Sequence, residues 1–321
     1  MSLLKDTKKI ARLLCKRFMK KNYINNDKTH KELSCIPLSV LQSMKKAEEL
    51  FSRAGIDSPE TDAYELMNHV TGLDRKDILS DPYLKLTEED SVKYHALVAD
   101  RVRRIPLQHI TGRAFFYGRE YKVNGNVLVP RFDTEILVEE ALKVIRPDDR
   151  VLDLCTGSGC IIISLDLGDE KESEHRCFLE GVATDISPGA LEVARHNADK
   201  YGVDNIKFIQ GDLFNGVSGT FDVIVSNPPY IATGEIDGLD PEVKKYDPLI
   251  ALDGGEDGLV FYRRIIKRSV CFLKPGGHIF LEIGYDQGKA VSGLLADEGF
   301  KDIRLVKDYG GNDRVVAGSL I

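Results

Sequence analysis

The chain has 321 residues, 42% of them hydrophobic, and its formal net charge at pH 7 is −7. This length predicts two domains, and the composition is that of a globular protein. No apolar stretch is long enough to span a membrane, and six cysteines without a C-x-x-C spacing favour a cytoplasmic protein without a disulfide framework. Seven scattered histidines lack the spacing of metal ligands, so we predict no metal site.

The charge is unevenly distributed. Residues 1–35 hold ten Lys and Arg against three Asp and Glu, a balance of +7, so the remainder carries −14. An acidic body is a poor match for a protein that holds a long nucleic acid by its phosphates. We therefore disfavour nucleic acid as a partner, except through this basic N-terminal extension. The extension itself is typical of a solvated, partly helical tail.

The next segment, residues 36–112, shows the periodicity of a small helical bundle. Apolar residues recur at helical spacing, and Thr87 followed by three acidic residues is a typical helix start. The segment holds no candidate nucleophile or ligand cluster, so we interpret it as a substrate-recognition domain. A glycine turn within 113–128 predicts a linker hairpin. Residues 129–321 form the fourth and last region.

From residue 150 onward, candidate strands and helices alternate. This alternation is typical of an α/β fold, in which helices cover both faces of a mostly parallel sheet. The strand candidates are Val151–Leu154, Gly181–Ile186, Ile206–Ile209, Val223–Ser226, His278–Ile283, Ile303–Val306 and Val315–Ala317. The helix candidates are Cys160–Leu167, Pro188–Tyr201, Gly258–Leu273 and Gln287–Glu298. In such sheets, ligands bind at the carboxyl ends of the strands.

The tetrapeptide Asn227-Pro228-Pro229-Tyr230 directly follows an apolar strand candidate. Two prolines in succession end the strand, and a residue before proline is restricted to extended geometry. The turn therefore presents two rigid acceptors, the side-chain oxygen of Asn227 and the carbonyl of Pro228, beside the ring of Tyr230. A planar group that carries –NH2 fits this arrangement, since its two donors meet two acceptors. The alternative is a rigid turn capped by an amide.

A loop of Cys155, Thr156, Gly157, Ser158 and Gly159 joins the first strand of this region to a helix. Its glycines allow the backbone to approach a ligand at a helix N-terminus. The third glycine of the dinucleotide fingerprint is replaced by isoleucine, which disfavours NAD.

Two acidic residues end the next two strands. Asp185 stands where an acid can accept both ribose hydroxyls of an adenosine, although it could instead cap the helix that starts at Pro188. Asp212 could accept from an adenine amino group while Leu213 and Phe214 pack on the ring. An adenosine ligand together with an amino-group clamp points to S-adenosylmethionine and to N-methylation.

From about Pro37 to Arg314, the chain resembles the PrmC/HemK family of peptide chain release factor N5-glutamine methyltransferases. Besides Asn-Pro-Pro-Tyr, the resemblance rests on the helical front domain and on three segments: Leu128-Val129-Pro130-Arg131 with Asp133-Thr134-Glu135, Tyr246-Asp247-Pro248 with Ala251-Leu252 and Gly254-Gly255, and Asp313-Arg314-Val315-Val316. It implies a Rossmann-like class I S-adenosylmethionine-dependent methyltransferase sheet of seven strands, the last antiparallel, in a methyltransferase domain at 129–321. Cys155, Phe132 and Leu213 depart from the family's usual glycine, proline and aromatic residue.

The resemblance implies N5-methylation of the glutamine in the Gly-Gly-Gln motif of class I release factors. Asn227, Pro228 and Tyr230 would be catalytic and, with Pro229, would hold the glutamine. Cys155 to Gly159, Asp185, Leu213 and Asn227 would contact S-adenosylmethionine, as would Asp212. We expect a monomer.

Two rival functions stay open. Adenine-N6 and guanine-N2 nucleic-acid methyltransferases share Asn-Pro-Pro-Tyr, but they predict a basic cleft. A non-catalytic protein would bind S-adenosylmethionine and transfer nothing. Arg131, Glu135 and Glu242 are conceivable substrate or positioning residues, and structural salt bridges are the favoured interpretation of them.

Overall fold

The computed structural model describes residues 38–168 and 177–321, so the basic extension at 1–35 lies outside the described residues. The chain divides into two compact units, Met1–Thr111 and Gly112–Ile321. Within the described residues, no helix combines the length and the apolarity that crossing a membrane requires.

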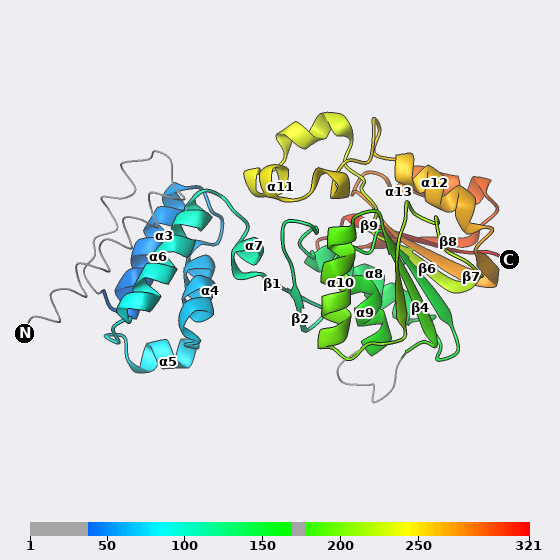
Figure 1. The fold of residues 1–321 in the computed structure, drawn as a ribbon. Helices are drawn as coiled ribbons and strands as arrows, with labels where there is room; N and C mark the ends of the chain where they lie inside the picture. Colours follow the sequence, from blue (N-terminus) through cyan, green and yellow to red (C-terminus); the bar gives the residue numbers. More distant parts are fainter. Residues whose placement is uncertain (1–37, 169–176) are drawn as a thin grey trace, which may run out of the picture. The chain divides into compact units, whose positions relative to one another are not determined.

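The described part of the first unit is helical (Figure 1). Side-chain caps fix two helix starts: Ser39 accepts a hydrogen bond from the backbone of Gln42, and Thr87 accepts one from the backbone of Asp90. The helices share one apolar core that includes Phe51. They are α3 (Val40–Arg53), α4 (Pro59–Thr71), α5 (Arg75–Ser80), α6 (Glu88–Val102) and α7 (Leu107–Thr111).

The described residues of the second unit contain a seven-stranded sheet in the order β5-β4-β3-β6-β7-β9-β8. Strands β3 to β7 pair in parallel, and β9 is antiparallel to both β7 and β8. The strands are β3 (Arg150–Leu154), β4 (Glu180–Asp185), β5 (Ile206–Gln210), β6 (Phe221–Ser226), β7 (Leu273–Glu282), β8 (Lys301–Lys307) and β9 (Asp313–Ser319). The predicted α/β sheet with an antiparallel last strand is therefore confirmed.

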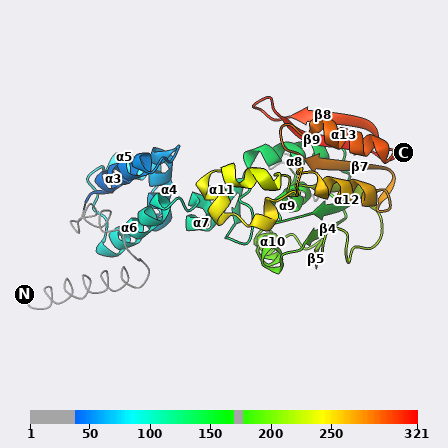
Figure 2. The same ribbon diagram turned by 90° about the horizontal axis from the view of Figure 1, so that it is seen from above.

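Helices cover both faces of this sheet (Figures 1 and 2). Successive residues of a strand point to opposite faces, so Val151 joins one apolar core with α8 and α9, and Leu152 joins a second with α12 and α13. The helices are α8 (Glu135–Leu142), α9 (Cys160–Leu167), α10 (Pro188–Lys200), α11 (Pro241–Tyr246), α12 (Val260–Ser269) and α13 (Gly288–Asp297), and the 3-10 turns are η1 (Phe132–Thr134), η2 (Thr233–Gly238) and η3 (Leu249–Ala251).

Two adjoining boundaries are wrong, because the strand predicted at His278–Ile283 begins at Leu273, inside the helix predicted before it. The helix expected at Gly258–Leu273 ends at Ser269, because Leu273 already pairs with Phe221 of β6 and so begins β7. An apolar run between a helix and a strand carries no periodicity that could separate the two. The pairing partner, which lies far away in the sequence, decides where the strand begins.

The hairpin of β1 (Arg113–Phe116) and β2 (Arg119–Lys122) belongs to the second unit. Tyr121 is fully buried, and its hydroxyl lies 2.8 Å from Oγ of Ser164 on α9. The side chain of Asn197 on α10 exchanges two hydrogen bonds with the backbone of Lys122, at 2.8 and 3.1 Å. The hairpin is thus tied to two helices of the sheet's cover.

Candidate active site

A cleft of about 230 Å³ opens at the carboxyl ends of β3, β4, β5 and β6. Ligands bind at this edge in open α/β sheets. Most of the residues that the sequence singled out line this cleft: Cys155, Thr156, Gly157, Ser158, Asp185, Asp212, Leu213, Asn227 and Pro229. The structure thus brings together the proposed cofactor loop and the Asn-Pro-Pro-Tyr turn.

The loop after β3 is tethered to the sheet. The backbone N–H of Thr156 donates to the carbonyl of Thr184 at 2.9 Å, and its hydroxyl donates to Oδ2 of Asp153 at 2.6 Å. Burial raises the pKa of Asp153 to about 7, although the hydrogen bond from Thr156 lowers it. The buried side chain of Asp153 therefore fixes the position of the loop that faces the cleft.

Cys155 adopts a left-handed backbone conformation with φ = 61°, which favours glycine. We expect Cys155→Gly to be more stable than Cys155→Ala by about 1 kcal/mol. Strain of about 1–2 kcal/mol at a non-glycine residue outweighs the extra backbone entropy of an unfolded glycine, about 0.4–1 kcal/mol. Urea denaturation of both variants measures the difference.

The exposed Ala296 on α13 supplies a control of opposite sign, because Ala296→Gly in a helix with ordinary φ should lower stability. Equal stability of the two Cys155 variants would show that this loop carries no backbone strain.

Gly159 does not line the cleft, and its contact with the cofactor stays a prediction. Its N–H is already bonded to the carbonyl of Thr156 at 2.9 Å. A Cβ at this position, where φ is 78°, would lie 3.1 Å from side-chain carbons of both Ala194 and Ile163. Glycine is needed here because α9 begins in close contact with α10.

Asp185 organises the loop as well as the cleft. Its two carboxylate oxygens accept hydrogen bonds from the backbone N–H groups of Gly157 and Ser187, both at 2.9 Å. Burial raises its pKa, against the lowering effect of these bonds. Ser187 is the residue that caps α10, by accepting from Ala190, so the alternative role of Asp185 as the cap is wrong. Each oxygen of an ionised carboxylate can accept a second bond, which leaves capacity for a ligand.

The two apolar residues in the turn after β5, Leu213 and Phe214, point in different directions. Leu213 is buried and lines the cleft, with φ = 54°. Phe214 points away from the cleft, since it is 1% exposed in the core and stacks on Phe272 with ring centroids 4.6 Å apart. The predicted contact of Phe214 with an adenine ring is therefore wrong. Asp212 stays at the cleft, paired with Arg264 at 2.6 Å.

Asn227 and Pro229 line the cleft, whereas Pro228 and Tyr230 do not. The amide nitrogen of Asn227 donates to the hydroxyl of Thr134 at 3.3 Å. Tyr230 packs against the core between the sheet and α12, and burial raises its pKa. A contact of the Pro228 carbonyl or of the Tyr230 ring with a substrate amide therefore stays a prediction.

The three charged residues left open by the sequence take different places. Arg131 lines the cleft and forms an ion pair with the buried Asp247 at 3.0 Å, and burial raises the pKa of Asp247 to about 6. Glu135 accepts a hydrogen bond from the backbone of Tyr117 in the hairpin turn at 2.8 Å. Glu242 lies in α11. Arg131 thus has the structural salt bridge that the sequence favours, whereas Glu135 accepts a backbone hydrogen bond instead.

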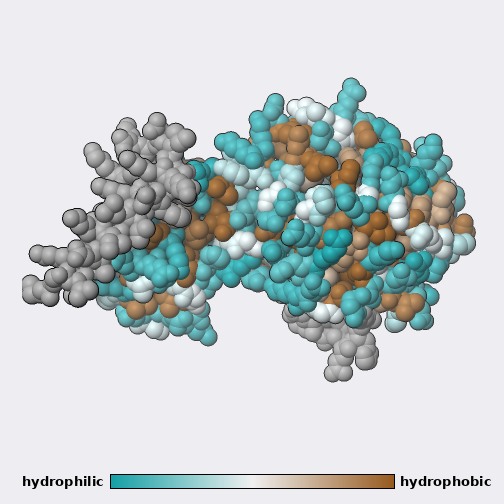
Figure 3. Space-filling view, in the orientation of Figure 1, coloured by the Kyte–Doolittle hydropathy of each residue, from teal (hydrophilic) through white to brown (hydrophobic). Residues whose placement is uncertain are grey.

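The segment with η2, α11 and η3 forms the rim of the cleft beside the Asn-Pro-Pro-Tyr turn. Leu249 and Ile250 are 60% and 53% exposed, and apolar side chains gather on the surface of this part of the second unit (Figure 3). Ile250 also lines the cleft. A Cβ at Gly254 would lie 2.8 Å from the Cα of Tyr230, so glycine lets the end of the rim pack directly on the turn.

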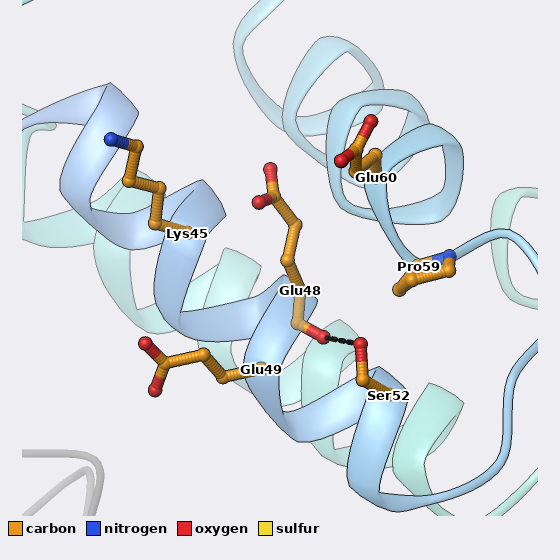
Figure 4. A pocket seen from close by; sticks show the side chains of 6 residues that line it. All are labelled: Lys45, Glu48, Glu49, Ser52, Pro59 and Glu60. Carbon is orange, nitrogen blue, oxygen red and sulfur yellow. Dashed lines mark hydrogen bonds between the residues drawn. The ribbon is translucent and has the colours of Figure 1, made fainter.

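A shallow groove on the first unit, of about 320 Å³, is lined by residues of α3 and of the start of α4. Figure 4 shows its carboxylates, Glu48, Glu49 and Glu60, together with Lys45. Burial raises the pKa of Glu48. None of the predicted site residues lines this groove, which is an acidic helix surface.

Some residues of the cleft carry no signal in the sequence. Arg264 meets Asp212 only because α12 lies beside the turn after β5, across 52 positions of sequence. Phe261 lines the wall for the same reason. Thr134 lies within one of the segments that carry the family resemblance, and this was the signal that could have identified it.

Comparison with known proteins assigns the family. Residues 42–112 match the PrmC N-terminal domain, and residues 131–239 match the methyltransferase small domain. A protein from Caulobacter vibrioides named release factor glutamine methyltransferase is 40% identical, over 88% of this chain and 96% of its own length. Proteins of the same name from Geobacter sulfurreducens and Agrobacterium fabrum are 39% identical, over 83% and 84% of this chain and 91% and 93% of their own lengths. The chain therefore belongs to the release factor glutamine methyltransferase family.

Proposed function

We propose that this protein transfers a methyl group from S-adenosylmethionine to the side-chain nitrogen of the glutamine in the Gly-Gly-Gln motif of class I release factors, in the cytoplasm. The observation that carries the proposal is that Asn227, from the Asn-Pro-Pro-Tyr turn, lines the same cleft as Asp185 and the loop after β3. The relatives' name supplies the substrate class.

The residues of the cleft fit S-adenosylmethionine. Both oxygens of Asp185 can accept ribose hydroxyls beyond their bonds to the backbone, and Leu213 with Ile186 supplies an apolar wall for the adenine. Asp212 gives one oxygen to Arg264, and its other oxygen would accept from the adenine amino group. Bound there, S-adenosylmethionine supplies an electrophilic methyl group on a positively charged sulfur.

Asn227 supplies the orientation that an amide nucleophile needs. An amide nitrogen is a poor nucleophile because its lone pair is delocalised into the carbonyl. If the oxygen of Asn227 and the carbonyl of Pro228 each accept one N–H, the nitrogen is held in one orientation and its lone pair is aimed along one line. Tyr230 would pack beside the amide plane. Orientation of this kind contributes several kcal/mol to a barrier reduction, with an upper range of roughly 7–11 kcal/mol.

The surface around the cleft favours a protein substrate over a nucleic acid. The rim presents the exposed apolar side chains of Leu249 and Ile250, which suit a folded protein loop. Residues 36–321 carry a net charge of −14, which would repel phosphates. We assign the helical domain at 36–112 to recognition of the release factor, because it matches the PrmC N-terminal domain and none of the residues proposed for chemistry lies in it.

Mass spectrometry of a release factor after incubation with the protein and S-adenosylmethionine tests the function. We expect the mass of one added methyl group on the peptide that contains Gly-Gly-Gln. A release factor with that glutamine replaced by glutamate should stay unmodified. Transfer of a tritiated methyl group to RNA or DNA, with none to the release factor, would instead assign the protein to the nucleic-acid methyltransferases.

A further inference from the structure

Glu282 is buried directly behind the proposed catalytic residue. It is the last residue of β7 and is 1% exposed. Strands β6 and β7 are parallel neighbours in which Ser226 pairs with Leu281. The following residues, Asn227 and Glu282, are therefore neighbours at the end of the two strands; Asn227 lines the cleft, and Glu282 is buried and does not.

Glu282 forms no ion pair within the described part of the chain, although the charge of Arg314 lowers its pKa. The nearby Arg314 on β9 is instead paired with Asp308 at 3.0 Å and with Asp133 at 3.2 Å. The Oε2 atom of Glu282 is buried without a hydrogen-bond partner among the described residues. A buried carboxylate without a direct ion pair destabilises the fold, and such a group beside a cleft is a candidate for a functional role.

The direction of the hydrogen bonds around Thr134 relates the charge of Glu282 to the orientation of the Asn227 amide. The amide nitrogen of Asn227 donates to the hydroxyl of Thr134 at 3.3 Å, and Thr134 is itself 2% exposed. The hydroxyl has one proton to give, and Thr134 and Asn227 both lie close enough to the buried carboxyl of Glu282 to lower its pKa as hydrogen-bonding neighbours. An ionised carboxylate can only accept. A chain that ends on it runs in one direction, from the nitrogen of Asn227 toward Glu282.

We propose that Glu282 and Thr134 are positioning residues, which hold the side-chain amide of Asn227 with its nitrogen toward the interior and its oxygen toward the cleft. The inference rests on the proposed role of Asn227 as the acceptor of a substrate N–H. If the amide were reversed, its NH2 group would face the NH2 group of the glutamine, and two donors cannot bond. A neutral carboxyl or amide at position 282 could donate to Thr134 and would permit that reversal.

Two substitutions of Thr134 test the hydroxyl. We expect Thr134→Val, which keeps the shape and removes the hydroxyl, to lower kcat for release factor methylation by about 10-fold or more, with the Kd for S-adenosylmethionine unchanged. Thr134→Ser should restore most of the activity that valine loses. A role in packing alone predicts the reverse order, since valine would fill the buried site and serine would leave a gap. Wild-type kcat in Thr134→Val would overturn the proposal.

Glu282→Gln gives a second readout, in which activity and stability separate. Burial raises the pKa of Glu282 to about 7, against the lowering effects of Thr134, Arg314 and Asn227. The stability that this raised pKa contributes is present at low pH and is lost as the pH rises through about 7. At pH 8, Glu282→Gln should therefore lower kcat without lowering Tm. A variant with lower Tm and unchanged kcat would assign Glu282 to structure alone.

The pH profile adds a signature of ionisation. We expect wild-type kcat to rise as the pH increases through about 7, where Glu282 ionises, and this rise to be absent in Glu282→Gln. The charged and titratable groups that interact with Glu282 are the same in the wild type and in Glu282→Gln, so their own titration would affect both proteins equally. These groups are Arg314, Asp133, Tyr230, Tyr262 and Cys160. The same rise in both proteins would contradict the role of Glu282.

Asn227→Ala in the same assay separates the two proposals. Wild-type activity in Asn227→Ala would overturn the catalytic role of Asn227 itself. Loss of activity in Asn227→Ala, combined with full activity in Thr134→Val and Glu282→Gln, would overturn only the positioning role.

Discussion

Asn227→Ala is expected to reduce kcat for methylation of a release factor by about 100- to 1,000-fold, the range observed when one preorganised hydrogen-bonding group is removed from an active site. The side chain lines the cleft, and its oxygen is the acceptor that we assign to the substrate amide. The cofactor loop and Asp185 are unchanged in this variant. The Kd for S-adenosylmethionine, measured by calorimetry, should therefore change far less than kcat.

Asn215 supplies a matched control, because it is an asparagine of the same unit that is exposed and does not line the cleft. Asn215→Ala should retain wild-type kinetics and stability. If Asn227→Ala retained its kcat as well, the Asn-Pro-Pro-Tyr turn would be a structural cap, which is the alternative that its sequence leaves open.

Asp185→Ala is expected to raise the Kd for S-adenosylmethionine by about 100-fold. Hydrogen bonds to a charged acceptor contribute about 1.5–3 kcal/mol each, and about 1.4 kcal/mol corresponds to a factor of ten. The substitution removes the acceptor for the ribose and also the partner of the Gly157 N–H, which holds the loop. Isothermal titration calorimetry measures the change. At saturating cofactor, kcat should be affected less than affinity.

Asp199, an exposed acid on α10, is the control for Asp185. Asp199→Ala should bind S-adenosylmethionine as the wild type does. Because burial raises the pKa of Asp185, wild-type affinity should weaken at acidic pH as this carboxylate takes up a proton. Unchanged affinity in Asp185→Ala would place the ribose elsewhere in the cleft.

The sequence predicts the parts of this site that depend on local chemistry. Two prolines stop a strand wherever it packs, so the position of Asn227 at the edge of the sheet follows from four residues. The end of β4 at Asp185 follows in the same way from an apolar run and a helix start. These features need no knowledge of the neighbouring strands.

Other features depend on partners that are distant in sequence. Glu282 reads as the polar end of a strand, and only the pairing of Ser226 with Leu281 places it beside Asn227. The sequence predicts that Phe214 packs on a ligand ring together with Leu213, yet it stacks on Phe272 in the core. The sequence shows that Phe214 is apolar and lies near a turn. It does not show whether the side chain after that turn points to the cleft or to the core.

The rim of the cleft is a closed loop with both ends fixed at the same place. Ile231 donates its N–H to the carbonyl of Leu252 and accepts from the N–H of Gly254, at 3.0 and 2.8 Å. Gln287 secures the adjoining turn by donating to the carbonyl of Tyr230 at 2.9 Å. Doubling the length of a loop with fixed ends costs only about 0.6 kcal/mol of closure entropy. The part of the rim that precedes Asp247 can therefore change in length to suit a different protein surface, while the ion pair of Asp247 with Arg131 and the geometry that aligns the amide stay the same.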